Sequence, residues 1–385
     1  MAINSGILKI YNYLVNCQVN FTFQHFSTSF KYTMTLSHES VNPIHPDVLA
    51  KMDPVFVKMY NEHVANIPNK PIDLYKLRAN YSKIYSYGTG ANPDIQNVEE
   101  LTFSSFDGGD VKIRIYRPND TKPEEILPVH IDFHGGGGGL GDLETEKHVL
   151  CHYVDLARVA VVDVDYRLVP DYAYPTYIND CFWALKYVYE NSGSLKFNKN
   201  SISIGGVSVG GNIAFIVSHL ARDNSIPLVL CVAGTPQVDD VEKYQSAQDS
   251  PYDSVREFEF APTLNWSRIT YFDKLKWQTL PEDATERLKK LNEIGWFKNV
   301  LNAPDFSNLV KTVVVTAGCD PMRDEGETYA AKLLQYGNEV VFKRYPGVPH
   351  PFMHMDSYLW QASDYIKYTA FEIALAHGTV KTFSN

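Results

Sequence analysis

Short apolar runs alternate with helix-length segments through the middle of this 385-residue chain. The runs read LPVHIDF, RVAVVDVD, SISIGG, PLVLCVAG, KTVVVTAG and EVVFKRY, and most are rich in β-branched residues. Runs of this kind, separated by stretches long enough for a helix, are typical of a mostly parallel sheet with helices on both faces. The pattern therefore predicts an α/β fold.

Two local signals precede these runs. The stretch LTFSSFDGGDVKIRIYRP predicts two strands that are joined through Asp107-Gly108-Gly109. Farther upstream, Asp53 and Pro54 predict the start of a helix, because aspartate can cap a helix and proline suits its first position.

The regular alternation stops between Pro236 and Pro304, where the sequence becomes polar, tryptophan-rich and helical in pattern. We interpret this stretch as an insertion that caps the core. The predicted division, in chain order, is a poorly defined N-terminal extension (1–33), an N-terminal cap segment (34–96), an α/β core (97–235 and 305–378) and, within that core, a cap insertion (236–304).

The composition argues against several classes of partner. A formal net charge of −10 is unfavourable for general binding to nucleic acid or anionic membranes. No apolar run approaches the roughly 18 residues of a membrane span, so stable membrane insertion is not expected. The N-terminus makes a poor signal peptide, and the scattered cysteines fit buried free thiols, which together favour a cytoplasmic protein. The five cysteines are Cys17, Cys151, Cys181, Cys231 and Cys319.

The stretch SISIGGVSVGGNIAF contains the pattern G-x-S-x-G, with Ser208 at its centre. It falls between an apolar strand and a helical run that begins near Asn212, and this context exposes such a serine above the sheet edge. The start of the helix adds a positive dipole end near developing negative charge. Ser208 is therefore the candidate nucleophile.

A serine hydroxyl is a weak nucleophile near neutral pH, so it requires a base, and the base requires an orienting acid. In this topology both follow later strands, in the order serine, acid, histidine. Asp320 comes directly after KTVVVTAGC, and His350 comes directly after EVVFKRYPGVP. The sequence thus predicts Ser208, Asp320 and His350 as a catalytic triad.

Two alternatives stay open at these positions. Asp324 and Glu325 lie about one helical turn beyond Asp320, although a structural role at a helix start suits them better. His354 lies four residues after His350, so the two histidines could share a helix face and bind a metal. No third ligand stands out, and we expect neither a metal site nor a cofactor.

Five consecutive glycines, Gly135–Gly139, follow His134 at the end of the predicted strand PVHIDF. Acyl transfer builds negative charge on the former carbonyl oxygen, and backbone N–H groups stabilise that charge. Such donors come from the residue after the nucleophile, here Val209, and from a glycine-rich loop after an earlier strand. A phosphate-binding loop does not fit, because neither G-x-x-x-x-G-K-[ST] nor a helix-opening G-x-G-x-x-G is present.

Taken together, several motifs resemble the hormone-sensitive-lipase family of α/β-hydrolases. They span about residues 128–352 and read HGGGGGLG, DYRLVPDYAYPTYINDCFWAL, GGVSVGGNIA, CDPMRDEGETYAAKLLQYG and YPGVPHPF. The resemblance implies an α/β-hydrolase fold with a helical cap. The implied site residues are the nucleophile Ser208, the general base and acid His350, the orienting Asp320, the oxyanion donors Gly136, Gly137 and Val209, the loop-packing His134, and the architectural Asp180 and Asp165–Arg167.

The chain departs from the family pattern at a few positions. Val207 and Val209 flank the serine where the family usually has an acidic residue and alanine. Pro351 replaces a glycine, and Gly138 and Gly139 replace bulky apolar residues. None of these changes removes a catalytic group. The larger Val209 and smaller Gly138 are expected to reshape the acyl and alcohol pockets.

The leading hypothesis is a serine carboxylesterase that cleaves small, fairly apolar esters through an acyl-enzyme. The same triad could instead serve a deacetylase, amidase or lactonase that acts on a specific metabolite. A catalytically silent small-molecule receptor is an alternative from another class, and it should lack a triad residue. The expected partner is a small-molecule ester, with no nucleic acid, and the sequence leaves room for a homodimer.

Overall fold

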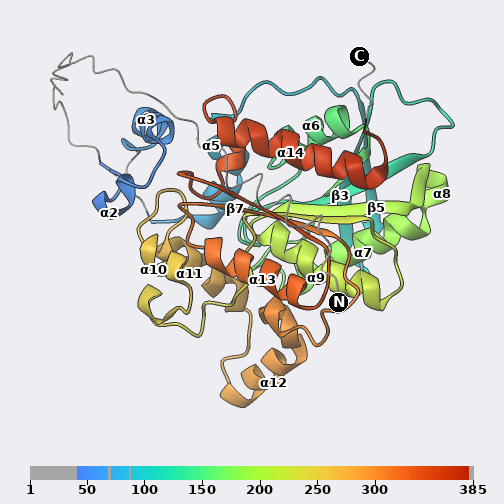
Figure 1. Ribbon diagram of the computed structural model, residues 1–385. Coiled ribbons are helices and arrows are strands. Elements are labelled where there is room, and N and C mark those ends of the chain that lie inside the picture. The colour runs from blue at the N-terminus through green and yellow to red at the C-terminus, as the bar shows by residue number, and fades with distance from the viewer. Residues whose placement is uncertain (1–40, 68–70, 86–87, 381–385) are drawn as a thin grey trace, which may run out of the picture. The chain divides into compact units, whose positions relative to one another are not determined.

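Figure 1 shows the computed structural model, which describes residues 41–67, 71–85 and 88–380. The predicted extension at 1–33 and the first residues of the segment at 34–96 lie outside the described residues. The boundaries of the predicted core and cap segments stay predictions.

A central sheet of eight strands is present within the described residues, in the order β1-β2-β4-β3-β5-β6-β7-β8. β1 pairs antiparallel with β2, and β2 pairs antiparallel with β4, whereas every other neighbouring pair is parallel. The mostly parallel sheet predicted from the apolar runs is therefore confirmed. The strands are β1 (Asn97–Ser104), β2 (Asp110–Arg117), β3 (Leu127–Phe133), β4 (Ala160–Asp165), β5 (Phe197–Val207), β6 (Leu230–Gly234), β7 (Thr312–Ala317) and β8 (Val340–Tyr345).

Helices cover both faces of this sheet (Figure 1), with α6 and α14 on one face and α7, α9 and α13 on the other. The α-helices are α2 (Pro46–Leu49), α3 (Pro54–His63), α4 (Leu74–Arg78), α5 (Tyr81–Tyr85), α6 (Lys147–Ala157), α7 (Thr176–Glu190), α8 (Ser192–Leu195), α9 (Val209–Asp223), α10 (Asp253–Glu257), α11 (Trp266–Trp277), α12 (Ala284–Ile294), α13 (Arg323–Gln335) and α14 (Trp360–His377). The 3-10 helices are η2 (Ala247–Asp249), η3 (Gly295–Lys298), η4 (Val300–Asn302) and η5 (Phe352–His354).

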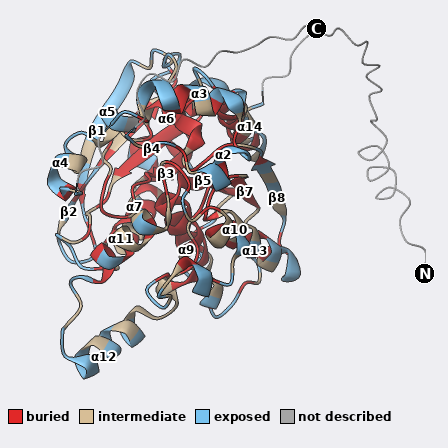
Figure 2. Ribbon diagram, turned by 90° about the vertical axis from the view of Figure 1, so that its left-hand side faces the viewer, coloured by how far each residue is buried: buried red, intermediate tan, exposed pale blue. Residues whose placement is uncertain are grey.

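The strands are apolar on both sides because both faces of the sheet are covered. In β4, Val161 packs into the cluster with α6 and α14, whereas the next residue, Val162, packs into the cluster with α7 and α9. Figure 2 shows the central strands as buried, in contrast to α12, which has no buried residue. Double-sided burial explains why continuous apolar runs, rather than alternating ones, predict these strands.

The two local signals that precede the apolar runs are also confirmed. The strands β1 and β2 form the expected hairpin, in which Ser104 pairs with Asp110 across the turn. The side chain of Asp53 caps α3 by accepting a hydrogen bond from the N–H of Val55 at 2.8 Å, and Pro54 is the first helical residue.

Short helices replace the alternating pattern between β6 and β7, where η2, α10, α11, α12, η3 and η4 follow one another. Four of the five cysteines fall in the described residues, and all four are buried free thiols. Among the helices that the structure describes, none combines the length and the apolar character that a membrane crossing requires.

Candidate active site

Ser208 occupies a sharp turn between β5 and α9. Its backbone has φ 61° and ψ −120°, a strained conformation for a residue with a side chain, and the helix begins at the next residue. The turn lies close against β3, because a Cβ atom at Gly210 would stand only 1.8 Å from the carbonyl oxygen of Phe133. The G-x-S-x-G pattern thus folds locally as a strand–turn–helix that holds the serine at the carboxyl end of the sheet.

The structure brings the three predicted triad residues together. His350 Nε2 lies 2.9 Å from Ser208 Oγ, and His350 Nδ1 lies 2.9 Å from Asp320 Oδ2. Asp320 follows β7 and is fully buried, whereas Ser208 and His350 are 9% and 5% exposed. When the Nδ1–H group of His350 donates a hydrogen bond to Asp320, Nε2 carries no proton and can accept the hydroxyl proton of Ser208.

The two neighbouring acids have structural partners elsewhere. Asp324 accepts a hydrogen bond from the N–H of Ser254 at 2.7 Å, and Glu325 accepts one from the N–H of Asp239 at 2.9 Å. Asp320 also accepts a hydrogen bond from the N–H of Met322 at 2.9 Å, which fixes the orientation of its carboxylate. Of these three acids, Asp320 is the one that contacts His350.

His354 does not form a metal pair with His350. Its Nε2 lies 3.2 Å from Glu146 Oε2, and both side chains are buried. Burial opposes the charged form of each group, but their mutual attraction prevails: it raises the pKa of His354 above 6.5 and lowers the pKa of Glu146 below 4.5. The other carboxylate oxygen of Glu146 accepts a hydrogen bond from the N–H of Gly135 at 3.1 Å.

The glycine loop lies beside the serine, since Gly135, Gly136 and Gly137 line the same pocket as Ser208. Within the part of the chain that the structure describes, the N–H groups of Gly136 and Gly137 donate to no protein acceptor. His134 stacks on the ring of Tyr166 with centroids 4.1 Å apart, and the Tyr166 hydroxyl donates to the His134 carbonyl at 2.8 Å. Free N–H donors on a braced loop suit a developing oxyanion.

Val209 is the third predicted donor, and it is the first residue of α9. A first-turn N–H has no acceptor within its own helix, so this group is available to a ligand. Its side chain is buried in the core and does not line the pocket. The position therefore offers a backbone donor at a helix N-terminus, next to the serine.

The pocket above Ser208 has a volume of about 720 Å³ and is open to solvent. Helices from distant parts of the chain line it: α4 and α5 come before β1, and α11 comes after β6. Its apolar lining residues include Leu77, Leu140, Val207, Leu264, Ile269, Phe272, Met322 and Pro351. A largely apolar pocket with a few convergent polar groups is typical of a small-molecule site.

Comparisons with known proteins agree with this geometry. A family model described as the alpha/beta hydrolase fold matches residues 130–354, which include the glycine loop, Ser208, Asp320 and His350. The chain belongs to the hormone-sensitive-lipase-like family of α/β-hydrolases.

Two curated proteins and one solved structure are similar to this hydrolase over two thirds or more of its length. An AB hydrolase superfamily protein of Schizosaccharomyces pombe is 33% identical over 339 residues, which are 83% of this chain and 93% of that protein. Carboxylesterase NlhH of Mycobacterium tuberculosis is 33% identical over 259 residues, 67% of this chain and 76% of its own. The solved structure of a hyperthermophilic esterase from Pyrobaculum calidifontis has a TM-score of 0.73 and 29% identity, and the match covers 84% of this chain and 98% of that one.

One expectation about the pocket of the hydrolase is wrong. Neither Val209 nor Gly138 lines the pocket above Ser208, so neither shapes the space for acyl or alcohol groups directly. The Val209 side chain points into the core, and a Cβ atom at Gly138 would meet the ring of Tyr177 at 2.8 Å. Val209 is thus accommodated in the core, and the ring of Tyr177 occupies the space beside Gly138.

Three residues that support the site of the hydrolase were not expected from the sequence. Glu146 holds the N–H of Gly135, and Arg78 donates from Nε to the carbonyl of Gly139 at 2.6 Å. Thr263, between β6 and β7, donates its hydroxyl to the carbonyl of His350. The Arg78 and Thr263 contacts join residues 61 and 87 positions apart in sequence, so no local pattern could have indicated them.

The architectural assignment of Asp180 in the hydrolase agrees with its contacts. Arg167 donates to both carboxylate oxygens of Asp180, at 2.9 and 2.7 Å, and to both oxygens of Asp107, at 3.0 and 2.9 Å. Ser105 also donates to Asp180 at 2.6 Å. This network ties the β1–β2 turn to α7.

Proposed function

We propose that this α/β-hydrolase is a serine carboxylesterase that cleaves small, fairly apolar esters through an acyl-enzyme intermediate. The observation that carries the proposal is the continuous line of contacts from Ser208 through His350 to Asp320, at 2.9 Å each, beneath an apolar pocket. The esterase names of the relatives support the same chemistry.

The first half-reaction forms the acyl-enzyme. Ser208 Oγ attacks the ester carbonyl carbon while His350 Nε2 takes the hydroxyl proton, and Asp320 stabilises the imidazolium that results. The N–H groups of Gly136, Gly137 and Val209 stabilise the negative oxygen of the tetrahedral intermediate. When the intermediate collapses, the bond to the leaving oxygen breaks and His350 returns its proton to the departing alcohol.

The second half-reaction releases the acid. Water loses a proton to His350 Nε2 and attacks the acyl carbon, and the same N–H groups stabilise the second tetrahedral intermediate. Collapse breaks the bond to Ser208 Oγ, which recovers its proton from His350. The product is a carboxylic acid, and the side chains return to their starting states.

The lining of the pocket supports small apolar substrates. The mainly apolar lining of the pocket beside Ser208 suits a short acyl chain together with a modest alcohol. Phe272 and Ile269 of α11 face the pocket together with Leu77 of α4. Segments outside the parallel sheet therefore set the shape of the substrate space.

Replacing Ser208 with alanine tests the proposal. We expect kcat for p-nitrophenyl esters to fall by on the order of 10⁴ or more, because the nucleophile is lost, while the protein stays folded. The wild type should be labelled at Ser208 by a serine-directed organophosphate. Near-normal ester hydrolysis by the Ser208→Ala protein would contradict the proposal.

A substrate panel separates the carboxylesterase from its alternatives. p-Nitrophenyl esters of increasing acyl length, measured beside amide and lactone analogues, should show preference for short-chain esters. Higher kcat/KM on an amide or lactone would identify an amidase or lactonase with the same triad. A protein that binds these compounds without turning any over would be a silent receptor.

We also propose a cytoplasmic location for the hydrolase. Four buried free cysteines support a reducing compartment, because paired cysteines are common in secreted proteins. Fractionation of the native source, with the protein detected by antibody, should recover it with cytosolic markers; recovery in the secreted fraction would refute the proposal.

A further inference from the structure

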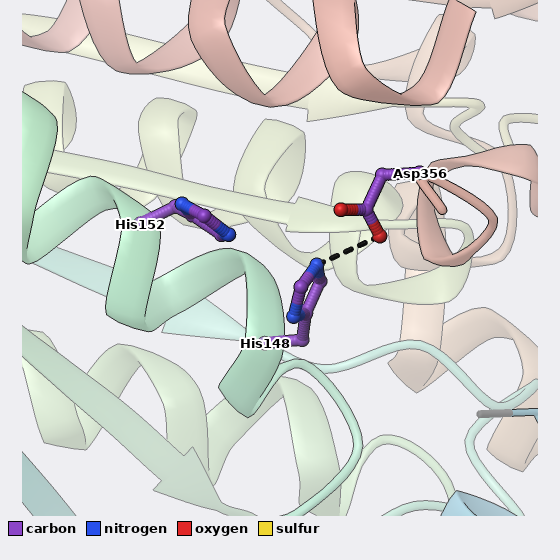
Figure 3. A group of neighbouring side chains, drawn as sticks. All are labelled: His148, His152 and Asp356. Carbon is purple, nitrogen blue, oxygen red and sulfur yellow. Dashed lines mark ion pairs between the residues drawn. The ribbon is translucent and has the colours of Figure 1, made fainter. Parts of the chain in front are cut away.

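Two histidines on α6 face a carboxylate from a distant segment. His148 and His152 are four residues apart, so they project from the same face of the helix on successive turns. Asp356 lies just beyond η5, and Figure 3 shows the two imidazole rings and this carboxylate gathered around one small space.

The donor atoms of these three side chains lie within 4.8 Å of one another. His148 Nε2 is 2.8 Å from Asp356 Oδ1, close to the roughly 3 Å that separates two ligand atoms bound about 2.1 Å from one ion. The Nε2 atoms of His148 and His152 are both buried; that of His148 pairs with Asp356, whereas that of His152 has no hydrogen-bond partner among the described residues. One buried imidazole nitrogen, Nε2 of His152, is thus left without a hydrogen-bond partner beside the His148–Asp356 pair.

Outer contacts hold these side chains in place. His148 Nδ1 lies 2.5 Å from Asn92 Oδ1, and Asp356 Oδ1 accepts a hydrogen bond from the N–H of Gly90 at 3.0 Å. Metal-binding histidines typically have the second ring nitrogen fixed in this way by an oxygen acceptor.

We propose that His148, His152 and Asp356 bind one divalent transition-metal ion. Two imidazoles and a carboxylate form a donor set that suits Zn²⁺ and its neighbours in the first row, with the remaining positions open to water. The one local sequence signal of this metal site is the pattern H-x-x-x-H at 148–152. No metal site was expected from the sequence. The proposed ion supplies no step to the ester hydrolysis described above.

The position of this site gives the ion a structural role. Glu146, two residues before His148, holds the glycine loop through Gly135, and Asp356 follows the segment that carries His350. An ion at the site would clamp α6 to that segment. Because the ion binds the folded protein, it should also stabilise the fold by mass action.

Metal binding is tested directly with Zn²⁺ and Co²⁺ on the metal-stripped full chain. Isothermal titration calorimetry with Zn²⁺ should give one site per chain, and Co²⁺ should give visible d–d absorption that Zn²⁺ removes. At a free Zn²⁺ concentration about 100 times Kd, Tm should rise by about 4 °C. Mg²⁺ should produce none of these effects, because it disfavours imidazole ligands.

Matched variants assign the ligands. His152→Gln and Asp356→Asn should each abolish the Co²⁺ absorption and weaken Zn²⁺ binding by more than about 100-fold, whereas Asn92→Ala should weaken it by about 10- to 100-fold. His63→Gln, which changes an exposed histidine of α3, should bind Zn²⁺ as the wild type does. Each variant is first checked for folding by circular dichroism.

The proposal is overturned if the folded wild type binds no Zn²⁺ tighter than Mg²⁺. It is also overturned if His152→Gln and Asp356→Asn both keep wild-type affinity and absorption. In that outcome the cluster is an ion pair between His148 and Asp356 with a neighbouring imidazole, and any zinc binds elsewhere.

Discussion

Gly136 occupies a backbone conformation that a residue with a side chain adopts only under strain. Its φ is 121°, and a Cβ atom there would stand 2.3 Å from the carbonyl oxygen of Leu140. That oxygen belongs to the backbone, so it cannot move aside as a flexible side chain could. The glycine therefore shapes the loop whose N–H groups face the pocket.

We predict that Gly136→Ala lowers kcat for a p-nitrophenyl ester by about two to three orders of magnitude, because the methyl group displaces an oxyanion donor. KM should change much less, since the donors act on charge that develops in the transition state. Gly139→Ala is the matched control: its backbone is not left-handed, and the nearest atom to a new Cβ is the flexible end of Leu275 at 3.2 Å. Wild-type kcat in a folded Gly136→Ala protein would contradict the oxyanion role of this loop.

Helix α6 links the glycine loop to the segment after β8. Glu146, at its N-terminus, accepts the N–H of Gly135 through one carboxylate oxygen and faces His354 through the other. Both the acid and the histidine are buried. Glu146 thus acts as a positioning residue, because it reaches the reaction through the loop that it holds.

We predict that Glu146→Ala lowers kcat by about 5- to 150-fold, which corresponds to the roughly 1–3 kcal/mol of a buried donor left without its acceptor. Glu146→Gln keeps an oxygen that can accept from Gly135, so it should retain more activity than the alanine variant. His354→Ala removes the ion pair but leaves the acceptor, and it should keep much of the wild-type kcat. Equal kcat values for Glu146→Ala and wild type, measured at saturating ester, would contradict the positioning role of Glu146.

At the scale of the whole molecule, the sequence predicts what depends on local pattern. The run KTVVVTAG becomes β7 because both of its faces are buried, and Asp320 follows that strand as the topology requires. The contacts that brace the site could not be predicted, because they join distant segments: Arg78 and Gly139 are 61 residues apart. Pocket shape is also non-local, and for this reason the expected effect of Val209 on the pocket was wrong.

A buried histidine outside the triad is expected to make the stability of the fold depend on pH. His219 of α9 is 1% exposed and packs against Trp296 and Phe306. Its Nε2 lies 3.1 Å from the hydroxyl of Tyr329, and its Nδ1 lies 3.1 Å from the carbonyl of Asp305. Burial, reinforced by the nearby charge of Arg222, lowers the pKa of His219 from 6.5 to about 4.

A lowered histidine pKa means that the unfolded chain binds the proton more tightly than the folded one. The stability that His219 contributes is therefore complete above pH 6.5 and is lost as the pH falls toward 4. The loss should amount to roughly 3 kcal/mol at most, since each pKa unit corresponds to about 1.4 kcal/mol.

Urea unfolding between pH 7.5 and 4.5 should show a shallower pH dependence for His219→Gln than for wild type, although the variant is less stable at pH 7.5. Tyr329→Phe removes a partner but keeps the titrating ring, so it should retain the wild-type slope. Parallel pH profiles for His219→Gln and wild type would show that acid sensitivity originates in other groups.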